Sequence, residues 1–443
     1  MEYDNVVDQA VREWVMTRGQ TPQSMSEMER KLRQWLLWLG NVLLHGWLLW
    51  LTPRYAAPAV RCPHCGGTAQ YQRKRAGKVL TAFGTVHYRR AYYLCSACHQ
   101  GHAPLDEELG LRPNAMSAEV ERLAALVAVQ MPFEKGREVF ETLTLVSLSD
   151  HSLDKAAQAY GAEIQGVEAA WYRQTLDAEA MLRRDREVPR PVRLYGTLDG
   201  GQVPTRGLKG EEQPWRELKV GAWFEAKGQP PRTPTDPWTI RAQTITYYTD
   251  IAAADDFGQL LWATGGQRDA HRARELIFLG DGGRWIWDLV EQHFPNAVQI
   301  VDWFHACEYL PPVAKAAFSD VQQQTAWIQQ VRTDLWQGRL DAVIAACAQL
   351  VSPQRDDDPA QKAVTYFSNN RQRMDYPTYR ANGYQIGSGT IESGVKQLAT
   401  QRLKVPGARW NLLSARMVAK ARAAFLSGQW DHLAAQRVLH PCA

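Results

Sequence analysis

The fold is decided by two apolar stretches that each end in an aspartate followed by glycines: LYGTLDGGQV at residues 194–203 and LIFLGDGG at residues 276–283. Short apolar runs bounded by glycines are typical of buried β-strands. The aspartates, Asp199 and Asp281, each close such a run. A carboxylate in this position is costly unless a positive charge meets it, and no Lys or Arg directly precedes either one. The glycines after each acid leave room for a ligand close to the backbone.

The sequence around these stretches predicts an α/β domain. Strands are expected over 192–199, 218–225, 244–249, 276–281 and 297–302, and helices over 257–264, 271–274 and 284–293. The order β-β-β-α-β-α-β is that of an RNase H-like sheet. Helices are expected over 313–350, then a polar loop over 352–359, and helices again from 390 to about 428. The sheet and the final helices are therefore separated by a helical insertion.

A third acid, Glu392, lies just inside the predicted helix that follows Gly387-Ser-Gly. Mg²⁺ binds one or two carboxylates together with phosphate oxygens, and two such ions assist an in-line phosphoryl displacement. The sequence therefore predicts that Asp199, Asp281 and Glu392 bind two Mg²⁺ (or Mn²⁺) ions. Taken singly, each acid has another explanation, because Asp-Gly-Gly is common in turns and an isolated helical Glu is usually solvated. Asp302 ends the fifth predicted strand and competes with Asp281, which its two glycines favour.

Two Cys-x-x-Cys pairs, Cys62/Cys65 and Cys95/Cys98, predict a structural Zn²⁺ site, because four thiolates can close a tetrahedral shell around zinc. Four free cysteines are a weaker explanation, since both pairs share one spacing. A redox pair would need a βαβ context, which is missing. The neighbouring histidines, at positions 64, 99 and 102, are expected at the surface. With 7 cysteines in 443 residues, the chain is not a disulfide-rich secreted protein, and a reducing cytosol is expected.

The charge distribution indicates a polyanionic partner. The net charge is only +4, but residues 54–104 contain eight Lys or Arg and no acid, and residues 393–430 contain seven and no acid. A solvated charged face would normally mix both signs. The candidate DNA-binding residues are Arg73, Lys74, Arg75, Arg89, Arg90, Lys396, Arg402, Lys404 and Arg409. Trp410 either stacks on an unpaired base or packs in the core.

The N-terminal part of the chain is expected to be helical. Residues 35–51 carry no charge over 17 residues, which is at the lower limit for a membrane span. Helical spacing of the apolar residues favours a buried or oligomerising helix instead. Met1–Ala10 has no Lys or Arg, so no signal peptide is expected. Further on, helices are expected from Ser117, over 137–145 and over 152–160 with Gly161 as the stop. This pattern is compatible with a helix-turn-helix, although such pairs are also common as plain core.

These observations predict a multidomain α+β protein. Its parts are an N-terminal helical region (1–53, a candidate for oligomerisation), a zinc-ribbon-like module (54–110), a helical, HTH-like DNA-binding region (111–190), an RNase H-like catalytic core (191–312), a helical insertion (313–385) and C-terminal helices that complete the core (386–443).

The sequence resembles bacterial insertion-sequence DDE transposases of the ISKra type, which are related to the Mutator-like and hAT groups. The matching stretches are LDGG (198–201), LGDGGRWIW (279–287), VDWFHACEY (301–309), IGSGTIESG (386–394) and QRLK (401–404). The resemblance implies that Asp199, Asp281 and Glu392 bind catalytic Mg²⁺. Related groups also carry a Cys-or-Asp, two residues, His motif, which Asp302 and His305 match and which is thought to support the active site.

From this resemblance we expect an enzyme that binds the terminal inverted repeats of its own element. It would hydrolyse phosphodiester bonds to expose 3′-OH ends and join them to target DNA, as a homodimer or larger assembly on double-stranded DNA. A cytoplasmic, nucleoid-associated location in a bacterium is expected. Two alternatives stay open: an RNase H-fold nuclease or resolvase that only cuts, and a non-catalytic zinc-ribbon DNA-binding regulator.

Overall fold

A computed structural model describes residues 9, 12, 13, 16, 24–55, 57–207, 215–229, 239–353 and 357–432. Most of the first 23 residues lie outside the described residues. Two predictions fall on them: the absence of a signal peptide, and part of the N-terminal helical region. The chain divides into two compact units. The first comprises Met1–Ala124, Arg137–Ser149 and Gln436–Ala443, and the second comprises Ala125–Gly136 and Asp150–Ala435.

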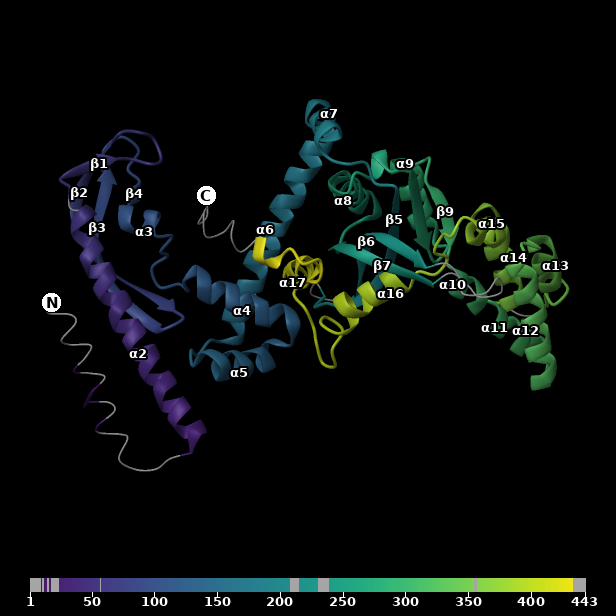
Figure 1. Ribbon diagram of the computed structural model, residues 1–443, viewed down its shortest axis with the longest axis horizontal. Helices are drawn as coiled ribbons and strands as arrows, with labels where there is room; N and C mark the ends of the chain where they lie inside the picture. The colour runs from purple at the N-terminus through teal and green to yellow at the C-terminus, as the bar shows by residue number, and fades with distance from the viewer. Residues whose placement is uncertain are drawn as a thin grey trace. The chain divides into compact units, whose positions relative to one another are not determined.

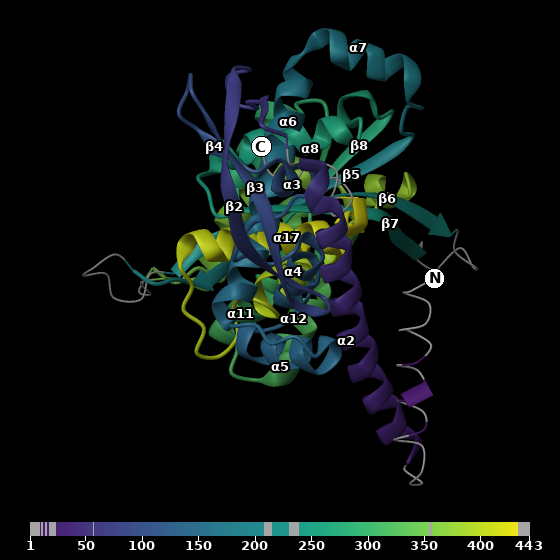
Figure 2. The ribbon, with the colours of Figure 1, turned by 90° about the vertical axis from the view of Figure 1, so that its left-hand side faces the viewer.

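The first unit contains a long helix beside an antiparallel sheet. The elements are α2 (Met25–Leu51), η1 (Thr52–Tyr55), β1 (Ala59–Arg61), β2 (Thr68–Thr81), β3 (Gly84–Cys95), β4 (Gly101–His102) and α3 (Pro104–Glu108). The four strands lie in the order β1-β2-β3-β4, and α2 runs alongside β3 (Figure 2). Leu44 and Leu48 of α2 pack against Val79 and Val86 of the β2–β3 hairpin. Within the part of the chain that the structure describes, no helix is both long and apolar enough to cross a bilayer.

Four helices follow: α4 (Ala118–Gln130), α5 (Phe133–Thr144), α6 (Asp150–Leu176) and α7 (Ala178–Glu187). The predicted helix over 152–160 with Gly161 as its stop is wrong, because α6 continues through Gly161 for 27 residues in all. A Cβ at Gly161 would lie 2.2 Å from the backbone oxygen of Met417 in α17 (Leu412–Leu426). This glycine therefore lets two helices approach closely and does not end one.

The second unit is built on a five-stranded mixed sheet. The strands are β5 (Arg193–Pro204), β6 (Trp215–Gln229), β7 (Thr239–Asp250), β8 (Glu275–Gly280) and β9 (Val298–Val301). They lie in the order β7-β6-β5-β8-β9, with β5–β6 and β6–β7 antiparallel and β5–β8 and β8–β9 parallel. A strand is present at each of the five predicted positions, and the first three are longer than expected. The mixed α and β content of the predicted fold is confirmed.

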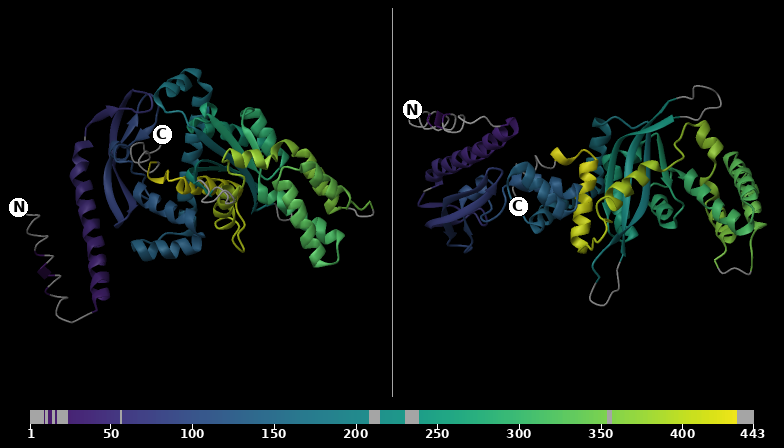
Figure 3. Two further views of the ribbon diagram at one scale, coloured as in Figure 1. Left: turned by 45° about the vertical axis from the view of Figure 1, so that its right-hand side comes forward. Right: turned by 90° about the horizontal axis from the view of Figure 1, so that it is seen from below.

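Helices cover both faces of this sheet (Figure 1). A Cβ at Gly265 of α8 (Ala254–Gln267) would lie 2.9 Å from Trp223, and a Cβ at Gly394 of α16 (Gly389–Val395) would lie 2.7 Å from Tyr247. Tyr247 pairs with Ala222, the residue before Trp223, so the two contacts lie on opposite faces of the sheet. Helix α17 packs against β7 and is coloured yellow in the right-hand view of Figure 3.

Helix α9 (Arg284–His293) connects β8 to β9 and packs against α8. The remaining helices follow β9 in the chain and share its core. They are α10 (Trp303–Glu308), α11 (Leu310–Ala317), α12 (Val321–Trp336), α13 (Leu340–Ala348), α14 (Pro359–Asn369) and α15 (Tyr376–Ala381). The ring of Trp303 lies edge-on to Trp336 and to Tyr376, with centroids 4.9 and 5.0 Å away. The Tyr376 hydroxyl donates to the backbone oxygen of Val301. These contacts fix the end of β9, where the candidate site begins.

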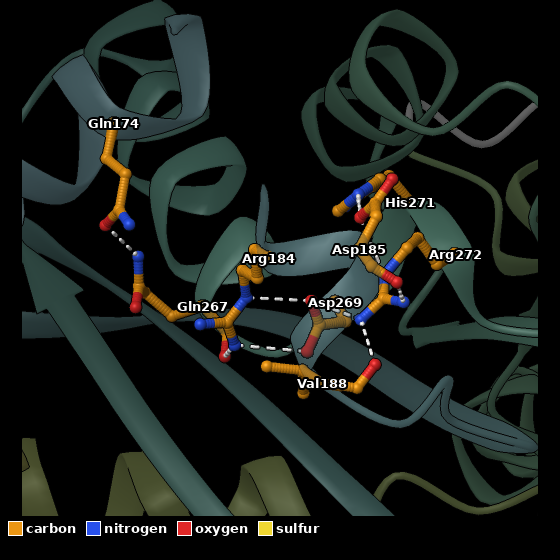
Figure 4. Close-up of polar contacts among 8 residues, drawn as sticks. All are labelled: Gln174, Arg184, Asp185, Val188, Gln267, Asp269, His271 and Arg272. Carbon is orange, nitrogen blue, oxygen red and sulfur yellow. Dashed lines mark hydrogen bonds and ion pairs between the residues drawn. The ribbon is translucent and has the colours of Figure 1, made fainter. Parts of the chain in front are cut away.

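A polar cluster fastens α7 to the segment between α8 and β8 (Figure 4). Arg184 donates to both carboxylate oxygens of Asp269, at 2.8 and 3.1 Å. Arg272 forms ion pairs with Asp269 at 3.0 Å and with Asp185 at 2.9 Å, and it donates to the backbone oxygen of Val188. Alternating charges at these distances neutralise one another, so the cluster holds the fold together and offers no unbalanced charge to a ligand.

Candidate active site and metal centres

Three aspartates lie level with one another where the parallel pairing of β5, β8 and β9 ends. Asp281 and Asp302 directly follow β8 and β9, whereas Asp199 lies within β5, which continues to Pro204, so the prediction that Asp199 ends its strand is wrong. Thr197 of β5 pairs with Leu279 of β8, so Asp199 and Asp281, each two residues further on, are level with one another. Gly280 pairs with Val301 of β9, which brings Asp302 level with Asp281. Because side chains alternate along a strand, Asp199 and Asp281 point to the same face of the sheet.

Helix α16 covers this face and carries Glu392. A Cβ at Gly201, two residues after Asp199, would lie 3.0 Å from Val395 of α16, so α16 lies over the side from which the Asp199 side chain projects. The Glu392 side chain is about half exposed, and the Ser388 hydroxyl donates to its Oε1 at 3.0 Å. The Nε2 of His305 lies 3.9 Å from the same oxygen. Residues nearly 200 positions apart in the sequence therefore converge here.

Asp302 is completely buried, and both of its carboxylate oxygens accept backbone hydrogen bonds. Oδ1 accepts from the N–H of His305 at 2.7 Å and caps α10, and Oδ2 accepts from the N–H of Ser388. The N–H of Trp303 in turn donates to the backbone oxygen of Ile386. Asp302 thus ties the end of β9 to the loop that leads into α16. The carboxylate of Asp281 is partly exposed, and its Oδ1 accepts from the N–H of Gly283 at 2.8 Å.

One group at this site could hold a metal ion. Among the described residues, ligand atoms of Asp302, His305 and Glu392 all lie within 4.8 Å of one another. Asp199 and Asp281 are not members of this compact group, although their charges act on it. Carboxylate and imidazole donors together suit several divalent cations, so this donor set fits a metal without selecting one. The identity of the metal and the assignment of its ligands stay predictions.

The electrostatics of the site reflect its excess of negative charge. The pKa of Asp199 is raised to about 6, chiefly by burial and also by the nearby charges of Asp281 and Glu392, against the opposing effects of the Gly200 N–H and His305. Burial lowers the pKa of His305, but the surrounding acids, chiefly Asp302 and Glu308, outweigh it, and the net pKa is raised. A divalent cation would relieve both the repulsion between the acids and the cost of burying Asp199.

Two residues at this site were not predicted from the sequence. Ser388 contacts both Asp302 and Glu392, and the small residues Gly387-Ser-Gly before the predicted helix were the available signal. Phe304 is 62% exposed between Asp302 and His305, and its ring lies 3.0 Å from where a Cβ at Gly387 would stand. An exposed aromatic ring beside the acids offers a flat apolar surface to a substrate. No pattern in the sequence predicts that Phe304 is exposed.

The four predicted cysteines come together in the first unit. All four sulfur atoms lie within 4.8 Å of one another, with Cys62 Sγ 3.6 Å from Cys98 Sγ and Cys65 Sγ 3.5 Å from Cys95 Sγ. A tetrahedral zinc ion with Zn–S bonds of about 2.3 Å separates its sulfurs by about 3.8 Å, so the cluster fits zinc. Hydrogen bonding from the Cys98 N–H, opposed by burial, lowers the pKa of Cys95 to about 6. The convergence of these cysteines is confirmed, and they could bind a structural zinc ion.

The backbone around the sulfurs is shaped for such a cluster. Gly66 has φ +74°, and its N–H donates to the backbone oxygen of Cys62 at 2.9 Å. On the other side, the N–H of His99 donates to the backbone oxygen of Cys95 at 3.1 Å. The expectation that all three nearby histidines lie at the surface is wrong for His102, which is buried and stacks on Tyr93.

Two of the nine predicted DNA-binding residues are buried and form hydrogen bonds within the fold. Arg90 is buried, forms an ion pair with Asp106 and donates to the backbone oxygen of Ala76 at 2.8 Å. Arg402 is 1% exposed and donates to the backbone oxygen of Ala128 at 2.8 Å. Their burial corrects the prediction, because neither guanidinium can reach a polyanion. Arg75 is partly buried, and the exposed candidates are Arg73, Lys74, Arg89, Lys396, Lys404 and Arg409.

Trp410 belongs to the core and not to a surface. It is 7% exposed, its indole N–H donates to the backbone oxygen of Leu403 at 2.8 Å, and the Arg402 guanidinium lies 4.8 Å from its ring centroid. Of the two roles left open for this residue, the structure therefore supports packing.

No model of a known protein family matches this chain, and no curated protein matches it either.

Proposed function

We propose that this chain is a DDE transposase with an RNase H-like catalytic domain, in which Asp199, Asp281 and Glu392 bind two Mg²⁺ ions. The observation that carries the proposal is the convergence of these acids at one edge of the five-stranded sheet. Asp199 and Asp281 are level on parallel strands, and Glu392 stands on the helix that covers the same face.

The topology of the sheet supports the same proposal. In chain order the strands lie 3-2-1-4-5, the first three antiparallel and the last two parallel to the first. This is the arrangement expected of an RNase H-like domain, and ligands of open α/β sheets bind at the carboxyl ends of the parallel strands. The helices α11 to α15 then correspond to the predicted insertion between the sheet and α16.

The protein's own residues have separable roles in this proposal. Asp302 and Ser388 hold the end of β9 and the start of α16 in register, so that Glu392 faces Asp199 and Asp281. His305 lies beside these acids, which raise its pKa, and it is the proposed donor of a proton to a phosphate oxygen or to a leaving 3′ oxygen. When bound, Mg²⁺ supplies activation of a water or 3′-OH nucleophile and neutralisation of the developing charge.

DNA binding is proposed for the exposed cations of both units. Arg73, Lys74 and Arg89 lie on the β2–β3 hairpin beside the cysteine cluster, and Lys396, Lys404 and Arg409 follow Glu392 in the chain. Their phosphate contacts would make binding strongly salt-dependent. The zinc-ribbon-like module and the helices that follow it are the proposed readers of the element ends, and double-stranded DNA is the proposed partner.

The test uses the purified full-length chain and DNA that carries its gene with both flanks. With Mg²⁺, the wild-type chain should cleave at the element ends, and Asp199→Ala, Asp281→Ala and Glu392→Ala should each abolish cleavage while DNA binding is kept. Asp288→Ala, which removes an exposed acid of α9, is the matched control and should cleave normally. Normal cleavage by all three active-site variants would remove the proposed site.

A second assay separates joining from cutting. With pre-cut ends that carry a free 3′-OH, a transposase should join them to a target plasmid in the presence of Mg²⁺. Hydrolysis without any joined product would instead indicate a nuclease that only cuts. DNA binding by the wild-type chain without cleavage would indicate a regulator.

A further inference from the structure

A basic cavity of about 570 Å³ lies at the far end of the β5–β6 hairpin. Its walls come from two segments of the second unit, the hairpin itself and the loop between η4 (Lys396–Thr400) and α17. The side chains that matter are Arg206 and Trp215 from the hairpin and Lys404 and Arg409 from the loop. The metal site described above uses none of them.

The cavity combines positive charge with an accessible aromatic ring. Arg206, Lys404 and Arg409 are exposed, and the described residues that line the cavity include no acid. Trp215 is 44% exposed, and the Lys404 ammonium lies 5.4 Å from its ring centroid. Three cations, with no acid among the described lining residues, attract an anion, and an indole face accepts a planar ring.

The loop is held in place before any ligand binds. The buried Trp410 anchors the loop through its backbone. Its backbone N–H donates to the backbone oxygen of Pro204, and its backbone oxygen accepts from the N–H of Arg206 at 2.6 Å. The Nε of Arg206 donates to the backbone oxygen of Arg409 at 3.2 Å. Gly407 has φ +78°, with no atom within 4 Å of where a Cβ would stand, so the turn itself requires glycine. A preorganised surface loses little entropy on binding.

We propose that this cavity binds single-stranded nucleic acid, with one unpaired base stacked on Trp215 and the flanking phosphates held by Arg206, Lys404 and Arg409. The origin of that strand rests on the proposed function: Pro204, the last residue of β5, is five residues beyond Asp199, about 17 Å along the strand at ~3.3 Å per residue. A strand opened next to a cut at the metal site would reach the cavity after a few nucleotides.

The aromatic ring decides between this ligand and other polyanions. A duplex keeps its bases stacked inside and offers only phosphates, so it would use the cations and leave Trp215 unused. An acidic peptide would also bind the cations without requiring the indole. Single-stranded nucleic acid is the ligand that uses both features.

The experiment measures binding of a fluorescein-labelled dT12 oligonucleotide and of a 20-base-pair duplex to the full-length chain by anisotropy, without added divalent ions. Trp215→Ala should weaken dT12 binding about tenfold and leave duplex binding within about twofold, whereas Trp215→Phe should stay near wild type. Lys404→Gln should lower the salt slope of dT12 binding by about 0.7. Lys227→Gln, at the opposite end of β6, is the matched control and should leave dT12 binding within about twofold.

Several outcomes would overturn the proposal. They are wild-type dT12 affinity in Trp215→Ala, an equal loss of dT12 and duplex binding, and displacement of dT12 by heptaglutamate at equal charge. Because no cleavage is measured, failure here leaves metal-dependent cleavage at the other site intact, and loss of cleavage there leaves this binding test unaffected.

Discussion

At the scale of single residues, Asp302 and Asp199 show how the surroundings give two aspartates different roles. Asp302 has both oxygens engaged by backbone N–H groups and has no contact with solvent. Asp199 lies at the same edge of the sheet, where its pKa is raised to about 6, chiefly by burial and also by the neighbouring acids. The first carboxylate organises the backbone, and the second is the one that a cation would stabilise.

Replacing Asp302 should affect stability first. Asp302→Ala leaves two buried N–H groups without an acceptor and should destabilise the second unit by about 2–5 kcal/mol. Asp302→Asn keeps one acceptor oxygen and should lose less, about 1–2 kcal/mol. Denaturant unfolding followed by tryptophan fluorescence measures both. Equal stability of Asp302→Ala and the wild type would show that these hydrogen bonds contribute nothing.

Asp199 predicts a pH dependence of stability in the absence of added divalent ions. Its pKa is about 6 in the folded chain and near 3.8 when unfolded, so between pH 4 and 6 the folded state binds more protons than the unfolded state. Stability should therefore fall as pH rises through this window, by up to about 3 kcal/mol.

Asp199→Asn should remove that part of the pH dependence and be more stable than the wild type at pH 7.5. Thermal unfolding between pH 4 and 8 measures the effect, with the exposed Asp288→Asn as the control. An identical pH profile for Asp199→Asn and the wild type would contradict it.

At the scale of elements, close approach between helices decides what a glycine does. Gly161 and Gly166 both lie within α6, but only Gly161 faces the backbone of α17. Gly161 therefore serves a packing contact, whereas a Cβ at Gly166 would have no neighbour within 4 Å.

This pair gives a matched test of the α6–α17 contact. Gly161→Ala should destabilise the second unit by about 1–3 kcal/mol, because a Cβ there would overlap Met417. Gly166→Ala should stabilise it by up to about 1 kcal/mol through helix propensity. Opposite changes in Tm are expected, and a rise in Tm for both variants would rule out the close contact.

At the scale of the whole molecule, the two units depend on different sources of stability. The second unit has a large apolar core that runs from Tyr195 through Trp223 to Tyr376. Around the cysteines of the first unit, the buried cluster consists of Cys62, Cys95 and three further residues, Ala69, Ala91 and Tyr93. So small a core needs a cross-link or a metal.

Zinc removal should therefore affect the units differently. Chelation or Cys62→Ser should expose the amides of β1, β3 and β4 to hydrogen exchange and leave those of β5 and β8 protected. His64→Ala, which alters an exposed residue between the same cysteines, should retain zinc. Unchanged exchange in β3 without zinc would show that the cysteine cluster folds unaided.

Self-association through α2 is a second prediction at this scale. Leu32, Leu36, Leu43 and Trp47 are 41–62% exposed, while Leu48 on the other side of the helix packs against the hairpin. Leu36→Glu with Leu43→Glu should shift the chain to a monomer in sedimentation equilibrium. Gln34→Glu adds charge on the same helix and should leave the assembly unchanged. A wild-type chain that is already monomeric would refute this role of α2.

The elements and the chemistry of the candidate ligands could be predicted from local sequence. Runs of apolar, β-branched and aromatic residues located all five strands of the second unit, and the Cys-x-x-Cys spacing located the four sulfurs. Asp199 and Asp281 were found because each closes an apolar run. These features are local, and local sequence is sufficient to specify them.

Which side chains are accessible to a ligand depends on how the chain packs. Arg90 and Arg402 are as basic as Lys404, yet their guanidinium groups are buried against backbone oxygens that are distant in the sequence. Gly161 was predicted to end a helix, because the packing of α17 against it cannot be predicted from local sequence. Ser388, Phe304 and the cavity at Trp215 depend on segments that meet only in the folded chain, because burial and proximity are properties of packing and not of the order of residues.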